Sequence, residues 1–286
     1  MEISVIIPTF TPGSYIFDCL DSIRNQSFNK DKFEVIIVLN GPKDPFYNDL
    51  LRYVEGNKIL NFLILYTEIK GVSHARNLAL DNIYSKYIVF MDDDDIVTSN
   101  YLEALYNGAD EDVIAVSNVR TFREDLDDLG DDYISKCFKR LKYNQKYDIF
   151  KYRGFLSSVW GKIIPAKTIG ENRFNPNFKI GEDSLFIFSI SNRIKKIAVC
   201  EDNVIYYRRI RDGSATRSST GIDETLINAF NSIISYTRIY LYKPFQYSSL
   251  VYFSRSIAIA IEVFNRLKIS DKSYIKNYPL IVFRFI

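Results

Sequence analysis

Cysteine, histidine and long apolar runs are scarce in this chain of 286 residues. Its three cysteines, Cys19, Cys137 and Cys200, are far apart and odd in number, which excludes a disulfide framework and a zinc-binding spacing. The single histidine, His74, is better explained by a surface or packing role than by catalysis. No run of about twenty apolar residues occurs, so we expect no transmembrane helix.

An excess of charge of one sign is also missing. The net charge of +2 gives no general reason to expect a nucleic-acid partner. Met1 and Glu2 lead straight into a strand pattern, so we expect no signal peptide and a cytoplasmic location. A hydrophobic content of 47% and a charged content of 25% are ordinary for a globular protein, and the chain is long enough to bury a sizeable core.

Strand and helix patterns alternate through the first 120 residues. This order favours parallel βαβ units and a doubly wound, nucleotide-binding type of sheet. The expected strands cover residues 3–7, 33–39, 59–66, 87–91 and 113–119. The expected helices cover residues 16–24, 46–55, 74–83 and 100–107.

The rhythm breaks after Val119, and we expect a charged, mobile excursion over residues 121–150. A helix is predicted to begin at Glu182 and end near Asn192. The later predicted elements are strands at 197–200 and 204–207, a loop at 208–221 and helices to the end. We therefore divide the chain into a domain at 1–215, with halves 1–120 and 121–215, and a helical region at 216–286.

Four consecutive carboxylates, Asp92 to Asp95, follow the apolar strand pattern that ends at Met91. The end of a buried strand is where open α/β sheets bind ligands. Adjacent acids repel one another, and a hard divalent cation offsets that repulsion while also holding substrate phosphates. A solvated turn with a helix cap is the alternative explanation of the same run.

These pieces resemble a family 2 glycosyltransferase of the GT-A fold, over roughly residues 1–215. The resemblance implies a mixed α/β sheet flanked by helices, with a C-terminal helical extension. The matching segments, in the order typical of the family, are Ser4–Phe10, Cys19–Ile23, Phe33–Val38, Gly71–Asn77, Phe90–Asp95, Gly181–Asp183 and Tyr207–Ser214.

The resemblance also implies a chemistry. Such an enzyme is a hexosyltransferase that moves a sugar from a nucleotide-diphosphate sugar to an acceptor hydroxyl with inversion. The Asp-x-Asp motif maps to Asp92 and Asp94, with Asp94 as the ligand of Mn²⁺ or Mg²⁺ and Asp92 facing the ribose or a metal-bound water. Asp95 fits better as a turn or cap residue. Asp183, at the head of a predicted helix, maps to the general base.

Other family positions imply the donor and acceptor contacts. The sequence Leu39-Asn40-Gly41-Pro42 departs from the usual Asp-Asp-Gly-Ser, although an Asn amide can still pair with a uracil edge, so we expect a UDP-sugar. The expected nucleotide contacts are Pro8, Thr9, Phe10, Asn40, Arg76, Asp92 and Asp93. The expected diphosphate loop carries Arg208, Arg211 and Ser214. The expected acceptor side carries Trp160, Lys162 and Glu182.

Two rival functions remain open. A nucleotidyltransferase needs a Gly-rich, basic phosphate loop near the N-terminus, and residues 8–14 contain no Lys or Arg. A sugar-nucleotide-binding protein without turnover would not need an intact Asp183 beside Asp92 and Asp94. The expected acceptor is a surface glycan, such as a capsule or lipopolysaccharide unit, or a polyprenyl-diphosphate-linked glycan. The aromatic and basic C-terminal helices either pack on the catalytic domain or lie on the inner face of the membrane.

Overall fold

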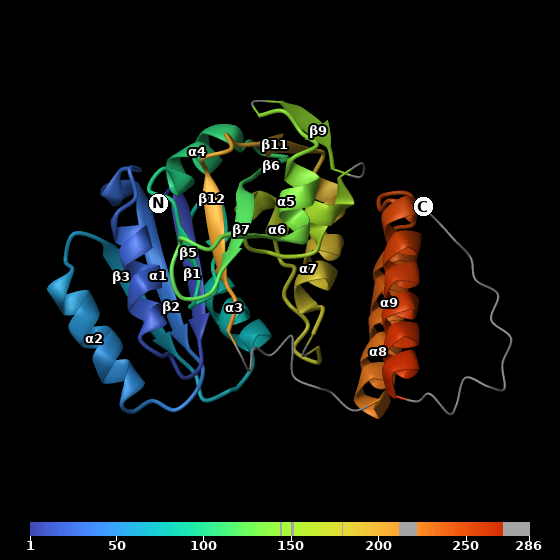
Figure 1. Ribbon diagram of the computed structural model, residues 1–286, viewed down its shortest axis with the longest axis horizontal. Coiled ribbons are helices and arrows are strands. Elements are labelled where there is room, and N and C mark those ends of the chain that lie inside the picture. The colour runs from blue at the N-terminus through green and yellow to red at the C-terminus, as the bar shows by residue number, and fades with distance from the viewer. Residues whose placement is uncertain (144, 150–151, 179, 212–221, 271–286) are drawn as a thin grey trace, which may run out of the picture. The chain divides into compact units, whose positions relative to one another are not determined.

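The computed structural model describes residues 1–143, 145–149, 152–178, 180–211 and 222–270. The chain forms two compact units, Met1–Thr216 and Arg217–Ile286 (Figure 1). Ser214, which we expected in the diphosphate loop, lies outside the described residues.

A mixed eight-stranded sheet forms the centre of the first unit (Figure 1). Four parallel strands begin it, and the antiparallel strand β10 separates them from β6. In spatial order the strands are β3 (Asn61–Tyr66), β2 (Phe33–Leu39), β1 (Ile3–Thr9), β4 (Tyr87–Phe90), β10 (Lys162–Pro165), β6 (Val113–Val116), β11 (Lys196–Val199) and β9 (Lys146–Asp148). The α/β fold class with a mixed sheet is confirmed.

The central strands are mostly apolar, as is typical of a sheet that helices cover on both faces. Every residue of β1 is buried, and β2 is buried except for the partly exposed Glu34. The chain steps from β1 to β2 to β3 in one direction and then returns to β4. Right-handed crossovers therefore place α1 (Tyr15–Arg24) and α2 (Phe46–Gly56) on one face and α3 (Val72–Leu80) on the other.

The strand register brings three chain segments to one edge of the sheet. Thr9 of β1 pairs with Leu39 of β2, and Ile6 of β1 pairs with Phe90 of β4. The carboxyl ends of β1, β2 and β4 therefore lie together. The acidic run that follows Met91 consequently lies beside the carboxyl end of β1.

A second, four-stranded sheet was not predicted. Its strands are β5 (Ile96–Val97), β12 (Ile205–Arg209), β7 (Asn118–Phe122) and β8 (Gly130–Asp131). The single strand expected over 113–119 is divided at Ser117 into β6 and β7, which belong to different sheets. Arg208 and Arg209 belong to β12 rather than to the expected loop, because they pair with Thr121 and Phe122 of β7.

The expectation of a mobile excursion over residues 121–150 is wrong for much of its length. This segment contains the end of β7, then β8, α5 (Tyr133–Phe138) and β9. Asp132 caps α5 by accepting a hydrogen bond from the backbone N–H of Ile134, and Ile134 and Phe138 are buried. A few well-placed apolar side chains anchor a segment whose composition is mostly charged.

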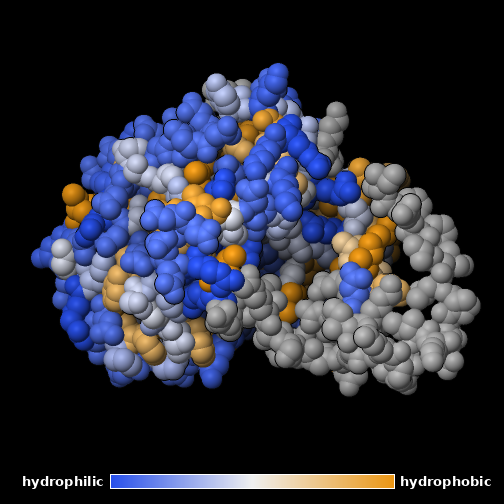
Figure 2. Space-filling view, in the orientation of Figure 1, coloured by the Kyte–Doolittle hydropathy of each residue, from blue (hydrophilic) through white to orange (hydrophobic). Residues whose placement is uncertain are grey.

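Six further helices of the described residues complete the first unit. They are η1 (Lys30–Lys32), α4 (Tyr101–Gly108), η2 (Arg153–Leu156), α6 (Ala166–Ile169), α7 (Glu182–Ile190) and η3 (Ser191–Arg193). Hydrophilic residues cover most of the face shown in Figure 2, with scattered apolar patches between them.

The second unit is a helical hairpin of α8 (Ile222–Tyr242) and α9 (Ser249–Ser270). Its two helices meet through stacked rings of Tyr240 and Tyr252, whose centroids are 4.6 Å apart. Tyr236 and Val251 are buried. In the part of the chain that the structure describes, no helix is long and apolar enough to cross a bilayer.

Candidate active site

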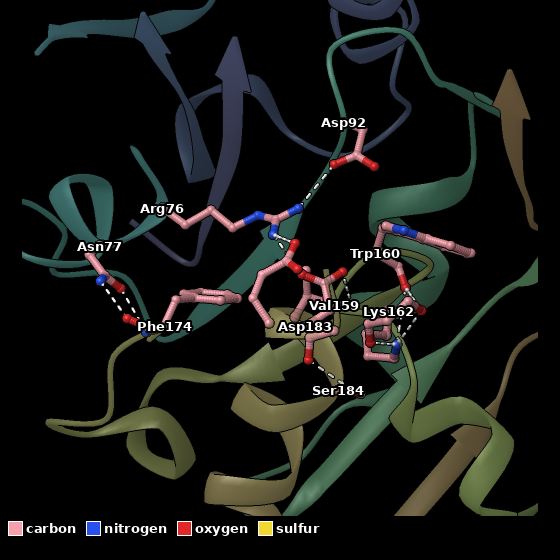
Figure 3. A network of polar contacts seen from close by, with 12 residues as sticks. Arg76, Asn77, Asp92, Val159, Trp160, Lys162, Phe174, Asp183 and Ser184 are labelled. Atoms are coloured by element: carbon pink, nitrogen blue, oxygen red, sulfur yellow. Dashed lines mark hydrogen bonds and ion pairs between the residues drawn. The ribbon is translucent and has the colours of Figure 1, made fainter. Parts of the chain in front are cut away.

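A buried arginine joins the acidic run to the head of α7 (Figure 3). The guanidinium of Arg76 donates to Asp183 Oδ1 at 2.6 Å and to Asp92 Oδ1 at 3.1 Å. Glu182 Oε1 lies 3.6 Å from the same guanidinium. Arg76 thus contacts three carboxylates from two segments that are about ninety residues apart in sequence.

The position of Arg76 follows from the way α3 begins. Gly71 precedes the helix with a φ of 122°, a conformation that disfavours other residues, and turns the chain into α3. The side chain of Arg76 is 3% exposed and lies over the ring of Phe174 at 5.3 Å. Burial lowers the pKa of Arg76. The charges of Asp183, Asp92 and Glu182 raise it by a larger amount, so the guanidinium keeps its charge.

Asp183 is held from two sides. Its Oδ1 accepts from Arg76, and its Oδ2 accepts from the backbone N–H of Val159 at 3.3 Å (Figure 3). It lies in the first turn of α7, after Gly181 in the left-handed conformation. Burial, and then the neighbouring charge of Asp183, raise the pKa of Glu182 to about 7. Asp183 and Glu182 are adjacent but have different environments.

Each of the four acids of the run has partners of its own. Asp92 pairs with Arg76, and Thr9 Oγ1 donates to Asp93. Asp94 pairs with Arg211 Nε, and Asp95 accepts from Tyr206 Oη at 2.5 Å and from the backbone N–H of Arg209 at 2.7 Å. Burial is the main cause that raises the pKa of Asp92 to about 6 and that of Asp93 to about 7.

Asp95 is the structural member of the run. It is 1% exposed, and burial raises its pKa well above the ordinary range. The hydroxyl of Tyr206 that donates to Asp95 also accepts the backbone N–H of Asp92 at 3.1 Å. Tyr206 therefore fixes both ends of the turn from Asp92 to Asp95. No motif in the sequence identified Tyr206, because its role depends on the register of β12 with β5.

The residues expected near the nucleotide lie at the same edge of the sheet. Pro8 and Thr9 end β1, and Phe10 follows with 41% exposure. Asn40 comes directly after β2, is buried, and donates its backbone N–H to the carbonyl of Thr9 at 2.9 Å. Arg76, also expected at the nucleotide, is buried and contacts Asp92 and Asp183.

The residues expected on the acceptor side occupy different depths. Trp160 is 9% exposed and stacks on Tyr206, with ring centroids 5.3 Å apart. Lys162 is 1% exposed and donates to the backbone carbonyls of Ser158 and Trp160 (Figure 3). These hydrogen bonds fix the backbone of the 158–160 segment. Arg208 pairs with Asp132 at 2.5 Å, and its guanidinium lies 5.9 Å from the centre of the Trp160 ring.

The donor atoms of this edge suit a hard divalent cation. Asp92 and Asp94 offer carboxylate oxygens, and such cations commonly take one or two protein carboxylates together with substrate phosphates and water. Among the described residues, no group of three or more His, Cys, Asp or Glu side chains is arranged to hold a metal. The fit therefore depends on oxygen ligands that a phosphate-bearing substrate supplies.

The raised carboxyl pKa values predict an unusual dependence of stability on pH. The pKa of Asp93 rises from an ordinary value of 3.8 to about 7, and that of Glu182 rises from 4.5 to about 7. Between those values the folded protein holds protons that the unfolded chain releases. The free energy of unfolding of the ligand-free protein should therefore fall as pH rises from about 4.5 to about 7, by about 1.4 kcal/mol per pH unit for each such proton.

Urea titrations at several pH values measure this slope. Glu182→Gln should flatten it, whereas Asp31→Asn, at an exposed position in η1, should leave it unchanged. A parent protein whose stability rises from pH 5 to pH 7 contradicts the assignment.

Comparison with known proteins identifies the family of this chain. The family model described as glycosyl transferase family 2 matches residues 4–161. Glycosyltransferase GlyA of Streptococcus pneumoniae is 30% identical over 76% of this chain and 32% of that protein. Poly(ribitol-phosphate) beta-glucosyltransferase of Bacillus spizizenii is 27% identical over 82% of this chain and 36% of that protein. The chain thus spans about a third of the length of these relatives.

The fold is also found in solved structures. The crystal structure of S. aureus TarS 1-349 in complex with UDP-GlcNAc superposes with a TM-score of 0.69 at 20% identity, covering 96% of this chain and 74% of that one. A mannosyltransferase from Pyrobaculum calidifontis in complex with GDP-Man and Mn²⁺ superposes with a TM-score of 0.57 at 15% identity, over 95% and 76%. With the family model covering more than half of its length, this chain belongs to glycosyl transferase family 2.

Proposed function

We propose that the chain is an inverting, divalent-cation-dependent glycosyltransferase that uses a UDP-sugar. The observation that carries this proposal is the Arg76 bridge between Asp92 and Asp183. Asp92 lies where the carboxyl ends of β1, β2 and β4 meet, which we propose binds the donor and call the donor edge. Asp183 lies at the head of α7. The bridge holds a candidate base and a candidate donor-side carboxylate in one fixed arrangement. Pre-alignment of this kind is a large part of the rate that enzymes give to bimolecular reactions.

The choice of UDP rests on two supports. TarS, which shares the fold, has been crystallised with UDP-GlcNAc and with UDP. Asn40 lies after β2, where its amide group can donate to and accept from a uracil edge. The mannosyltransferase with GDP-Man shows that the same fold also accepts another base, so a GDP-sugar is the competing donor.

The transfer step is a displacement at the anomeric carbon. Asp183 accepts the proton of the acceptor hydroxyl while the acceptor oxygen forms a bond to that carbon. The bond from the carbon to the diphosphate oxygen breaks on the opposite side, so the configuration inverts and the nucleoside diphosphate leaves. A divalent cation held by Asp92 and Asp94, when bound, supplies neutralisation of the charge that develops on the leaving diphosphate.

Replacing the candidate base should separate catalysis from binding. Asp183→Asn keeps the size of the side chain but removes its basicity, and general-base assistance is typically worth about 10²–10⁴-fold. We expect single-turnover transfer to slow by that order while UDP affinity stays close to the parental value. Glu182→Gln on the adjacent residue is the matched control and should slow transfer far less. Near-parental transfer by Asp183→Asn would remove it from the mechanism and make Glu182 the next candidate.

Replacing the candidate metal ligand should affect binding instead. Asp94→Ala removes one of the two carboxylates assigned to the cation, so Mn²⁺-dependent UDP binding measured by calorimetry should be lost. Asp49→Ala, which removes an acid from the surface of α2, serves as the control. An Asp94→Ala protein that binds UDP and Mn²⁺ like the parent contradicts the metal assignment.

The acceptor in this proposal is a hydroxyl of a surface glycan or of a lipid-linked glycan, reached at the inner face of the membrane. The residues assigned to the transferase domain are 1–215, and those assigned to membrane attachment are 216–286. The hairpin supports attachment because it exposes apolar and aromatic side chains beside cations, as interfacial helices do. Examples are Phe245, which is 101% exposed, and Tyr242, which is 80% exposed beside Lys243.

A sedimentation experiment tests the attachment. The purified protein should co-sediment with vesicles that contain anionic lipid, and less of it should do so at high salt because exposed charges are screened. Phe245→Ser should reduce the bound fraction, whereas Tyr84→Ser, at an exposed position in the first unit, should not. Indifference to both vesicles and detergent favours packing of the helices on protein.

A further inference from the structure

The carboxylate assigned to the cation already has a positive partner within the chain. Arg211 Nε donates to Asp94 Oδ2, and the Asp94 side chain is only 14% exposed. The guanidinium of Arg211 also lies over the ring of Tyr15, with Cζ 4.2 Å from the ring centroid. Tyr15 and Asp94 thus form a binding position for one cationic group at the donor edge.

The neighbouring arginines do not contact the carboxylate of Asp94. Arg208 pairs with Asp132, at the start of α5. Arg209 donates to the backbone carbonyl of Asp94 at 2.9 Å and to Asp18 at 3.0 Å, while its guanidinium lies 4.6 Å from the centre of the Phe122 ring. Of these three arginines, Arg211 is the one whose partner is the side chain of a candidate metal ligand.

A divalent cation at Asp94 would lie within a few ångströms of the Arg211 guanidinium, and two positive groups at that distance repel each other. The diphosphate of a donor removes the conflict, because its oxygens attract both groups. The fork of a guanidinium also matches phosphate oxygens, and such charge-assisted pairs are among the stronger hydrogen bonds.

We propose that Arg211 occupies the cation's place at Asp94 in the free protein and transfers to the donor diphosphate when cation and nucleotide bind together. This inference rests on the proposed function and adds a positioning residue to it. Its consequence is that the cation alone binds weakly, the nucleotide alone binds weakly, and each strengthens the other. Because coupling between two ligands is reciprocal, the same factor appears in both affinities.

Binding measurements without turnover test the exchange. Mn²⁺ is titrated alone, with free Mn²⁺ followed by its electron paramagnetic resonance signal, and UDP is titrated by calorimetry with and without Mn²⁺. In Arg211→Gln, Mn²⁺ alone should bind more tightly than in the parent, while UDP in the presence of Mn²⁺ should bind more weakly. The coupling between Mn²⁺ and UDP should fall by about tenfold, within the usual range of such couplings.

Two further variants sharpen the result. Tyr15→Leu removes the ring that contacts Arg211 without changing any charge. It should therefore strengthen the binding of Mn²⁺ alone, as Arg211→Gln does, but by a smaller factor. Arg52→Gln removes an arginine paired with Asp49 on α2, and it should leave all three titrations unchanged.

The outcomes separate the two proposals. Opposite shifts of Mn²⁺ and UDP affinity in Arg211→Gln support the exchange. Unchanged affinities, or a weakening of Mn²⁺ binding, would show that Arg211 only stabilises the fold and would overturn it, while the metal assignment stands if the parent binds Mn²⁺ and UDP cooperatively. A parent that shows no binding of Mn²⁺ with UDP removes the metal-dependent function and the exchange together.

Discussion

The site depends on one buried charge. A guanidinium that is 3% exposed is stable only if carboxylates replace the water it has lost, and Arg76 obtains them from Asp92, Glu182 and Asp183. Removing one partner of a buried pair typically costs about 3–5 kcal/mol, because the other charge stays buried without compensation. The acidic run and α7 therefore depend on the Arg76 side chain of α3, which contacts both. The fold and the candidate chemistry share this interaction.

Much of this arrangement could be predicted from local patterns. The apolar runs of β1, β2 and β4 identify buried strands, and the abrupt change after Met91 identifies the acidic edge. What could not be predicted depends on register between distant segments. The second sheet exists because β12 pairs with β7 about ninety residues earlier, and neither sequence shows a partner preference. The 121–150 segment misled for a related reason: its charged composition hides Ile134 and Phe138, which fix α5 in place.

The acidic run illustrates the same limit at the level of single residues. The sequence alone does not show what each of the four adjacent carboxylates, Asp92 to Asp95, contacts. In the structure each faces a different partner, and only Asp95 is fully buried. Burial, and then the charges of neighbouring carboxylates, raise the pKa of Asp92 and Asp95, so the ligand-free protein carries a cost that a bound cation or a nearby arginine relieves. Functional sites commonly break local stability rules in this way.

Two independent connections tie the donor edge to the candidate base. The first is Arg76, which contacts Asp92 and Asp183 directly. The second runs through the 158–160 segment, where the N–H of Val159 donates to Asp183 and the next residue, Trp160, stacks on Tyr206. The hydroxyl of Tyr206 in turn accepts the N–H of Asp92. A closed loop of contacts resists distortion better than a single bridge does, because neither connection can lengthen without straining the other. Such bracing is what keeps reacting groups within the small tolerances that catalysis needs.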